Sequence, residues 1–219
     1  MMMYIPKPFL VEEWEEITSF VKRYPAVHLV TVGHDGIPQA TLLPVVWDSH
    51  PLENENYGTL ITHISRGNPQ WKEIKNGDFG LAIVQGAQAY VSPSNYEKKK
   101  TDHKVVPTWN YQMVHLTGTL TVSEDKELLR AIVSNLTDFH EHHREIPWSA
   151  SESDPDYMEA QLAGIVAITM NVTGVEAKYK LSQNRPEVDR ISISNDLAQS
   201  LKPEENVIAA EMQRLFHQG

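Results

Sequence analysis

The chain has 219 residues, 41% of them hydrophobic, with a formal net charge of −10 and no cysteine. This length supports one substantial core, and the 5 Trp, 8 Tyr and 5 Phe exclude a disordered chain. The acidic balance excludes a protein that wraps nucleic acid with its whole surface, and the lack of cysteine excludes disulfides and cysteine-held metals. Without an apolar leader or a run long enough to cross a bilayer, the sequence predicts a cytoplasmic protein with no membrane partner.

The first third of the chain predicts one helix followed by strands. Apolar residues recur at helical spacing over 10–23, which predicts a helix there. Two β-rich runs then flank His34-Asp35-Gly36, and the Asp-Gly pair favours a hairpin. A further strand is predicted over 57–64. Behind it, Asn68 is expected to cap a short helix that begins at Pro69, with Trp71 and Ile74 on its inner face.

The remainder of the chain alternates strands with helices. Many strands joined by tight turns, with helices near the ends, predict a mainly β (α+β) fold, an antiparallel barrel with packed helices. Strands are expected over 79–84 and 87–92, split by Gly86, and over 111–122, with a bulge or bend at Gly118. A helix capped by Ser123 is expected to run to about His143, followed by a loop over 145–156. The chain is then expected to form a strand over 164–181 and a helix over 203–217.

Polar residues gather in "THISRGNPQW", between the predicted strand and the short helix. A phosphate group binds well to a guanidinium fork, hydroxyl donors and unpaired backbone N–H groups. Arg66 offers the fork, Thr62 and Ser65 offer hydroxyls, and the helix that opens at Pro69 offers N–H groups. Turns and helix caps use the same residue types, so a capped turn without a ligand remains open here.

Aromatic and basic residues gather over 85–111. Tyr90, Tyr96, Trp109 and Tyr111 could stack on a planar ring. The strongest basic cluster lies among them and indicates either a solvated loop or a flap that brings positive charge to an anionic ligand or to DNA; it consists of Lys98, Lys99, Lys100 and Lys104.

Two other stretches favour structural interpretations. The histidines of "FHEHHRE" have poor ligand spacing, so we expect a solvated helix end and no metal site. Lys178, Lys180 and Arg185 in "KYKLSQNR" are typical of an edge strand protected against aggregation. No nucleophile motif, P-loop or dinucleotide fingerprint is present.

Five stretches together resemble the PaiB family, bacterial proteins described as FMN-binding negative transcriptional regulators of sporulation and degradative-enzyme genes. They are "MYIPKPF" (3–9), "HISRGNPQWK" (63–72), "AYVSPSNY" (89–96), "VPTWNY" (106–111) and "KLSQNR" (180–185). Two positions depart from the family pattern: Leu42, where histidine is common, and Asn95, where tryptophan is common.

The resemblance implies an FMN-binding split β-barrel, similar to the pyridoxamine-phosphate-oxidase-like flavin proteins, with FMN between the subunits of a homodimer. It implies a barrel domain over 1–190 and a helical extension over 191–219 packed on the same domain. The implied cofactor-binding residues are Thr62, His63, Ser65, Arg66, Asn68, Tyr90, Trp109, Asn110 and Tyr111.

Three functions compete at this point: a flavin-binding repressor with DNA as a possible partner, a flavin-dependent reductase or oxidase in which the flavin carries the redox chemistry, and a haem or other ligand protein on the same barrel.

Overall fold

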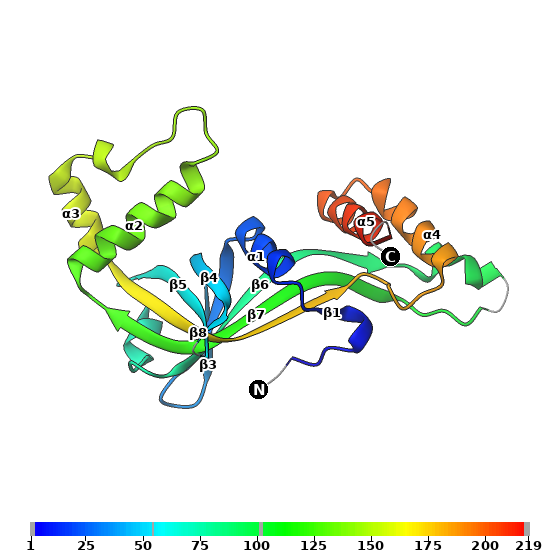
Figure 1. The fold of residues 1–219 in the computed structure, drawn as a ribbon, viewed down its shortest axis with the longest axis horizontal. Helices are drawn as coiled ribbons and strands as arrows, with labels where there is room; N and C mark the ends of the chain where they lie inside the picture. The colour runs from blue at the N-terminus through cyan, green and yellow to red at the C-terminus, as the bar shows by residue number, and fades with distance from the viewer. Residues whose placement is uncertain (1–2, 54, 101–102, 217–219) are drawn as a thin grey trace. The chain divides into compact units, whose positions relative to one another are not determined.

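The computed structural model describes residues 3–53, 55–100 and 103–216. Its strands form a mainly antiparallel sheet in the order β3-β2-β6-β7-β8-β5-β4, with β1 paired to β8 (Figure 1). The chain thus has the mainly β fold with flanking helices that the sequence predicts, and within the described residues the strand order is an open path, so the sheet is not closed. The strands are β1 (Leu10–Val11), β2 (Ala26–Val32), β3 (Pro38–Pro44), β4 (Val46–Glu53), β5 (Asn56–Ser65), β6 (Phe79–Val91), β7 (Thr108–Ser123) and β8 (Ile165–Lys180).

The helices lie at the ends of the chain and after β7. The α-helices are α1 (Trp14–Arg23), α2 (Lys126–Glu141), α3 (Pro155–Ala163), α4 (Glu187–Ala198) and α5 (Pro203–Phe216). Short 3-10 helices add η1 (Lys7–Phe9), η2 (Pro69–Glu73), η3 (Pro93–Asn95), η4 (Glu97–Lys100) and η5 (Ala150–Glu152).

The chain divides into two compact units. Unit 1 comprises the described residues of Met1–Glu13, Gln85–Val114 and Glu176–Gly219, and unit 2 comprises Trp14–Val84 and His115–Val175. Strands β6, β7 and β8 therefore each contribute one part to unit 1 and the other part to unit 2.

The predicted hairpin of unit 2 is confirmed as β2 and β3, which pair from Ala26↔Pro44 to Val32↔Pro38. The turn closes because Gly36 adopts a φ of 79°, which favours glycine. The carboxylate of Asp35 accepts a hydrogen bond of 2.9 Å from the backbone N–H of Ile37. The Asp-Gly pair thus forms the turn as predicted, because the glycine adopts the positive φ and the aspartate carboxylate binds a backbone N–H of the turn.

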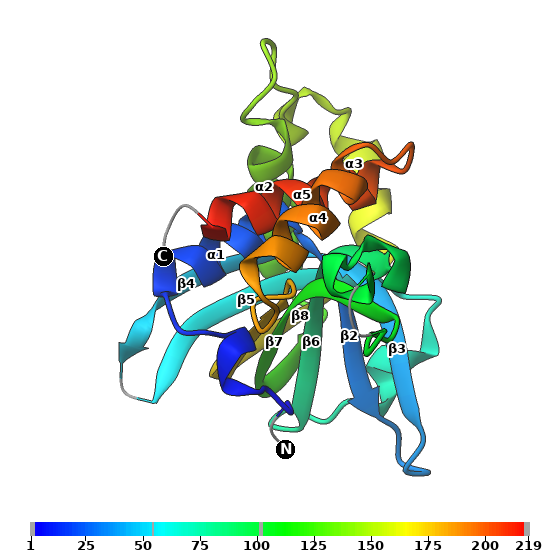
Figure 2. The same ribbon diagram turned by 90° about the vertical axis from the view of Figure 1, so that its right-hand side faces the viewer.

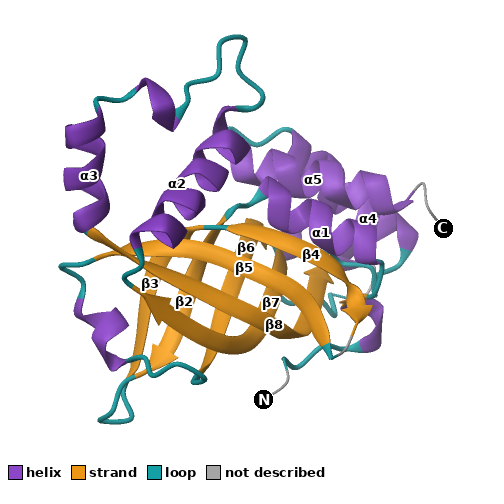
Figure 3. Ribbon diagram, turned by 60° about the vertical axis from the view of Figure 1, so that its left-hand side comes forward, coloured by secondary structure: helices purple, strands orange, loops and turns teal. Residues whose placement is uncertain are grey.

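Alternating burial builds the core of unit 2. Strand β5 buries every second residue from Gly58 to Ile64 and pairs with β8 from Thr59↔Asn171 to Ser65↔Ile165. Helix α2 lies over β5, as Figure 3 shows. An apolar cluster joins α2, α3 and β8 and consists of Leu129, Ile132, Leu136, Leu162 and Ala167.

Two glycines of unit 2 lie where backbones approach closely. A Cβ on Gly118 would lie 2.0 Å from the carbonyl oxygen of Asn171. A Cβ on Gly58 would lie 1.9 Å from the carbonyl oxygen of Asp48, and Gly58 also has a φ of 98°. Any larger residue at either position must move backbone.

Unit 1 covers one side of its strands with two helices. Helices α4 and α5 pack side by side (Figure 2). The buried amides of Asn110 and Gln112 on β7 reach α5, where they donate to the sulfur of Met212 and the carboxylate of Glu211 at 3.4 and 3.3 Å. Because side chains alternate along a strand, Tyr111, which lies between Asn110 and Gln112, points to the opposite side of β7.

Several predicted elements need correction. The first helix begins at Trp14, because Leu10 and Val11 pair with Lys178 and Ala177 of β8. Gly86 does not interrupt β6, which is one strand. Helix α2 is capped by Asp125, whose carboxylate accepts from the N–H of Leu128 at 2.8 Å, and not by Ser123. Helices α3 and α4 and strand β4 were not predicted as separate elements.

Candidate functional site

The predicted phosphate cluster spans the end of β5 and the turn after it, in unit 2. Thr62 faces the core with 1% of its surface exposed, and its hydroxyl donates to the carbonyl of Pro44 at 2.6 Å. The hydroxyl of Ser65 is exposed and accepts from the backbone N–H of Gly67 at 3.2 Å. Of these two hydroxyls, the one on Ser65 is open to a ligand in solution.

Asn68 caps η2 as the sequence predicts. Its side-chain oxygen accepts from the backbone N–H of Gln70 at 3.0 Å, and its amide donates to the hydroxyl of Thr41 at 2.9 Å. Gln70 is the buried residue of η2, whereas Trp71 is half-buried. The amide of Gln70 donates to the carbonyl of Leu29 and the hydroxyl of Thr31 at 3.1 and 3.0 Å, so η2 is fastened to β2.

Arg66 is held by three acceptors within unit 2. Its Nε donates to the carbonyl of Ala163 at 2.7 Å, and one terminal nitrogen donates to the carbonyl of Ile165 at 3.2 Å. The other terminal nitrogen forms an ion pair with the carboxylate of Glu124. A guanidinium has five N–H donors, so Arg66 and Ser65 keep donors that fit a phosphate, although the charge of Glu124 opposes an incoming anion.

His63 lies on the opposite face of β5 from Thr62. Its Nδ1 is buried without a hydrogen-bond partner. Burial lowers the pKa of His63, so the imidazole is favoured in its neutral form. A neutral imidazole offers a ligand one donor and one acceptor but no charge.

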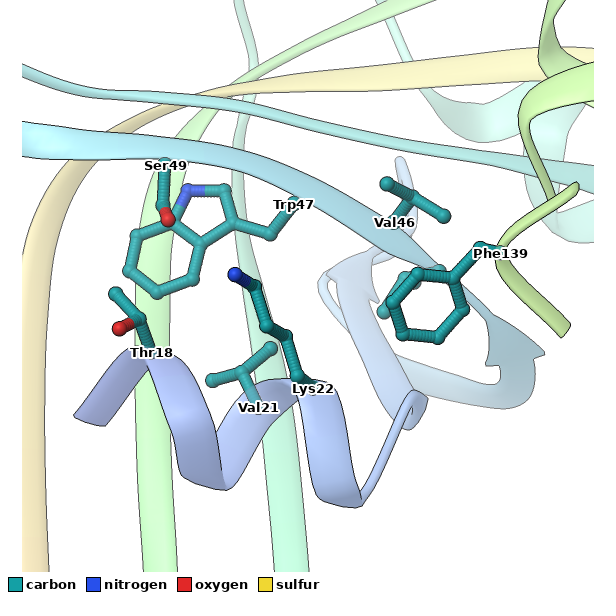
Figure 4. Close-up of a pocket in the computed structure, with 8 residues that line it drawn as sticks. Thr18, Val21, Lys22, Val46, Trp47, Ser49 and Phe139 are labelled. Carbon is teal, nitrogen blue, oxygen red and sulfur yellow. The ribbon is translucent and has the colours of Figure 1, made fainter. Parts of the chain in front are cut away.

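A small pocket of unit 2 lies beside α1 and is not formed by the strand-end residues (Figure 4). Its volume of about 80 Å³ is well below the ~300 Å³ at which cofactor sites begin. Its lining is Thr18, Val21, Lys22, Val45, Val46, Trp47, Ser49 and Phe139. The pocket is too small for a flavin ring.

A larger cavity lies in unit 1 beside two of the predicted stacking residues. The rings of Tyr90 and Trp109 meet edge to face with 6.1 Å between their centroids, and 45% and 51% of their surfaces are exposed. The cavity measures about 620 Å³, within the range of small-molecule sites. Its other lining residues are Gln88, Ala89, Leu201, Lys202, Pro203, Glu204 and Glu205.

Tyr111 lies between two lysines of β8. The ammonium groups of Lys178 and Lys180 stand 5.4 and 6.0 Å from the centre of its ring. Asn110 has a different environment, because its side chain is fully buried and accepts from the hydroxyl of Ser182 at 3.0 Å. Asn110 therefore supports the turn after β8 from inside unit 1.

The predicted site residues thus form two groups. Thr62, His63, Ser65, Arg66 and Asn68 lie in unit 2, and Tyr90, Trp109, Asn110 and Tyr111 lie in unit 1. Sequence reasoning missed the carboxylate of Glu124 beside Arg66, which is 58 positions away in the chain. It also assigned Lys178 and Lys180 to edge protection, although "KLSQNR" already stood out as a motif.

The basic loop after β6 is partly neutralised. Lys100 forms an ion pair of 2.6 Å with Glu97, and the ammonium of Lys99 lies 3.4 Å from the hydroxyl of Ser94. Lys104 is exposed, and the side chain of Lys98 lies outside the described part of the chain. Asn95, one of the two departures from the family pattern, donates to the carboxylate of Asp196 at 2.7 Å.

Residues 3–174 match the family model described as "Putative FMN-binding domain". The chain is also 36% identical over 214 residues to "Protease synthase and sporulation protein PAI 2" of Bacillus subtilis, covering 98% of this chain and 96% of that protein. The chain belongs to the PaiB family. The resemblance of the five sequence motifs to that family is confirmed.

Solved structures share the fold of this PaiB-family protein. The FAD and heme binding protein of Mycobacterium smegmatis matches with a TM-score of 0.56 at 17% identity, over 83% of this chain and 78% of that one. A conserved hypothetical protein of Mycobacterium tuberculosis matches with a TM-score of 0.55 at 11% identity, over 84% and 95%.

Within the described residues, no helix combines the length and apolarity needed to cross a bilayer. In the same part of the chain, no three His, Asp or Glu side chains gather closely enough to hold a metal ion.

Proposed function

We propose that this protein binds FMN and acts as a negative transcriptional regulator of the PaiB type, with FMN at the interface of a homodimer. The observation that carries the proposal is the match of residues 3–174 to an FMN-binding family. This range contains the end of β5 and the turn after it. The name of the Bacillus subtilis relative supports a link to sporulation and degradative-enzyme genes.

At the strand end, the FMN phosphate would be held by Arg66 and Ser65. Arg66 reaches from the end of β5 and keeps N–H donors beyond its three internal bonds. Ser65 adds a hydroxyl from the exposed side of the same turn. When bound, the flavin supplies the redox and optical chemistry, and these residues supply only binding and orientation.

Arg66→Ala is expected to weaken FMN binding by roughly tenfold to a hundredfold, because a charge-assisted bond contributes ~1.5–3 kcal/mol. Arg66→Lys should recover part of the loss, since lysine keeps the charge without the fork. Glu124→Gln should strengthen FMN binding by removing the competing carboxylate. Calorimetric titration gives the affinity of the wild-type protein and the three variants for FMN and for riboflavin, which lacks the phosphate.

Arg130→Ala is the matched control, because Arg130 is an exposed arginine of unit 2 that forms an ion pair with Glu159. It should leave FMN affinity unchanged. Equal affinity of the wild-type protein for FMN and riboflavin, or an unchanged FMN affinity in Arg66→Ala, contradicts the phosphate grip at the strand end.

The regulatory part of the proposal places DNA on the basic loop, through Lys98, Lys99, Lys100 and Lys104. If these lysines contact phosphates, the logarithm of DNA affinity should fall with the logarithm of salt concentration by about 0.9 per contact. Replacing all four by alanine should flatten that slope. Fluorescence anisotropy with a labelled duplex at several salt concentrations tests it, and no binding at low salt contradicts direct repression.

A further inference from the structure

Four of the five stretches that carry the family resemblance converge in unit 1. Lys180 of "KLSQNR" donates to the hydroxyl of Thr108 and the carbonyl of Trp109, both in "VPTWNY". Tyr90 of "AYVSPSNY" meets the ring of Trp109. At the other end, the ammonium of Lys178 donates to the carbonyl of Tyr4, in "MYIPKPF", at 3.0 Å.

These contacts define one continuous surface, here named the aromatic–lysine face. Its members are Tyr4, Tyr90, Trp109, Tyr111, Lys178 and Lys180. On β7 the residues on either side of Tyr111, Asn110 and Gln112, point to α5. Tyr111, which lies between Asn110 and Gln112 in sequence, therefore faces away from α5 together with Lys178 and Lys180, whereas Tyr90 and Trp109 line the cavity beside the start of α5, in Figure 1 the helix at the C-terminal end of the chain.

The positive charge of this face is not neutralised. Within the described residues, Lys178, Lys180 and Arg185 form no ion pair with a carboxylate. The carboxylate of Glu176, two positions before Lys178, accepts the backbone N–H of Met3 at 3.0 Å. Burial, together with the charges of Lys178 and Arg185, lowers the pKa of Lys180. An anion placed here would relieve that repulsion.

The turn that follows Lys180 is held in a strained shape. Ser182 adopts a φ of 64°, which L-residues rarely occupy, and its hydroxyl donates to the buried side chain of Asn110. Gln183 accepts from the backbone N–H of Leu181 at 2.7 Å and donates to the carbonyl of Tyr179. Such a conformation costs roughly 1–3 kcal/mol and persists where surrounding contacts enforce it, often at functional sites.

We propose that the aromatic–lysine face binds a ligand in which a planar ring carries a phosphate, with the phosphate held by the ammonium groups of Lys178 and Lys180 and the ring against Trp109. Lys180 uses two of its three donors internally and Lys178 one, so three N–H groups remain for the phosphate. The exposed rings beside a cavity of about 620 Å³ supply the stacking surface. FMN and a nucleoside monophosphate share this chemistry. The inference rests on the proposed function for FMN, and it does not depend on that function for a nucleoside monophosphate.

The test compares each phosphate ligand with its dephosphorylated form. Calorimetry measures FMN against riboflavin and adenosine monophosphate against adenosine, on the wild-type protein, the double variant Lys178→Gln with Lys180→Gln, and Arg66→Ala. For at least one pair, the wild-type protein should prefer the phosphate form by roughly tenfold to a hundredfold. The double lysine variant should reduce that preference nearly to one.

Lys75→Gln, at an exposed lysine of unit 2, is the control for the loss of positive charge and should keep the preference. Lys178→Arg should also keep the preference for the phosphate form, because arginine retains the positive charge. Loss of the preference in the glutamine variant can then be assigned to the lost charge and not to a folding defect. Ligand binding should quench tryptophan fluorescence less in Trp109→Phe than in the wild-type protein. Such a difference supports the position of the ligand ring against Trp109.

The outcomes separate this inference from the proposed phosphate grip. If the preference for FMN is lost only in Arg66→Ala and the lysine variant keeps every phosphate preference of the wild-type protein, the strand end is supported and the lysine site is overturned. A preference for FMN lost only in the lysine variant supports the lysine site and contradicts the phosphate site at Arg66, whereas a preference for adenosine monophosphate lost only in the lysine variant supports the lysine site alone. The absence of a phosphate preference for both ligand pairs overturns both.

Discussion

Gly58→Ala is expected to lower the free energy of unfolding by about 3–5 kcal/mol, the sum of two separate penalties. The first penalty is the φ of 98°, which an alanine rarely adopts. The second is the position of the new Cβ, 1.9 Å from the carbonyl oxygen of Asp48, which is backbone and cannot rotate away. Because natural domains are stable by only about 5–15 kcal/mol, this loss is a large fraction of the total. Urea unfolding followed by circular dichroism measures it.

Two other glycines separate the penalties. Gly36 shares a positive φ of 79° but has open space around its Cβ position, so Gly36→Ala should cost about 1–2 kcal/mol. Gly118 has the close approach to Asn171 without a positive φ, so Gly118→Ala should cost about 2–3 kcal/mol. If Gly58→Ala is no worse than Gly36→Ala, the contact between β4 and β5 is looser than the structure shows.

Gln70→Ala is expected to cost about 3–4 kcal/mol, because the side chain is 1% exposed and satisfies several buried groups. The substitution leaves the hydroxyl of Thr31 and the carbonyl of Leu29 without the amide that now binds them. It also removes the contact that fastens η2 to β2. The same urea titration gives the change in unfolding free energy.

Gln70→Glu tests whether hydrogen bonding or volume accounts for the loss. It keeps the shape but directs an oxygen at the carbonyl of Leu29, so it should destabilise the protein about as much as alanine does. Gln85→Ala, at an exposed glutamine, should stay within about 0.5 kcal/mol of the wild-type protein. A mild effect of both Gln70 variants would contradict the role of this side chain in holding η2.

Local signals predicted much of the fold because their causes are local. The Asp-Gly turn before β3 and the Asn68 cap of η2 both depend on residues within three positions of each other. Helix α4 escaped prediction because its pattern is mixed: Ile193 and Leu197 are buried, but so are Asp189 and Ser194, while Val188 and Ile191 are exposed. Spacing rules that place apolar residues inside cannot detect such a helix.

The candidate site was predictable by residue type but not by arrangement. The residue types in "THISRGNPQW" indicate an anion-binding site. The ion pair of Arg66 with Glu124, however, joins the end of β5 to the residues before α2, and no local pattern predicts it. The meeting of Lys180 with Trp109 likewise depends on the pairing of distant segments. Periodicity reports which face a residue takes, and it does not report which distant segment lies beside that face.

The interleaving of the two units has a consequence for any attempt to shorten the protein. The FMN-binding family match ends at residue 174, immediately before the last segment of unit 1, which begins at Glu176. A fragment cut at that boundary would lose Lys178, Lys180, helix α4 and helix α5, which binds the buried amides of Asn110 and Gln112. With β8 truncated, the unit 1 part of β7 would present its buried amides to water and an open strand edge to other chains, so the fragment should aggregate although it contains the entire family domain.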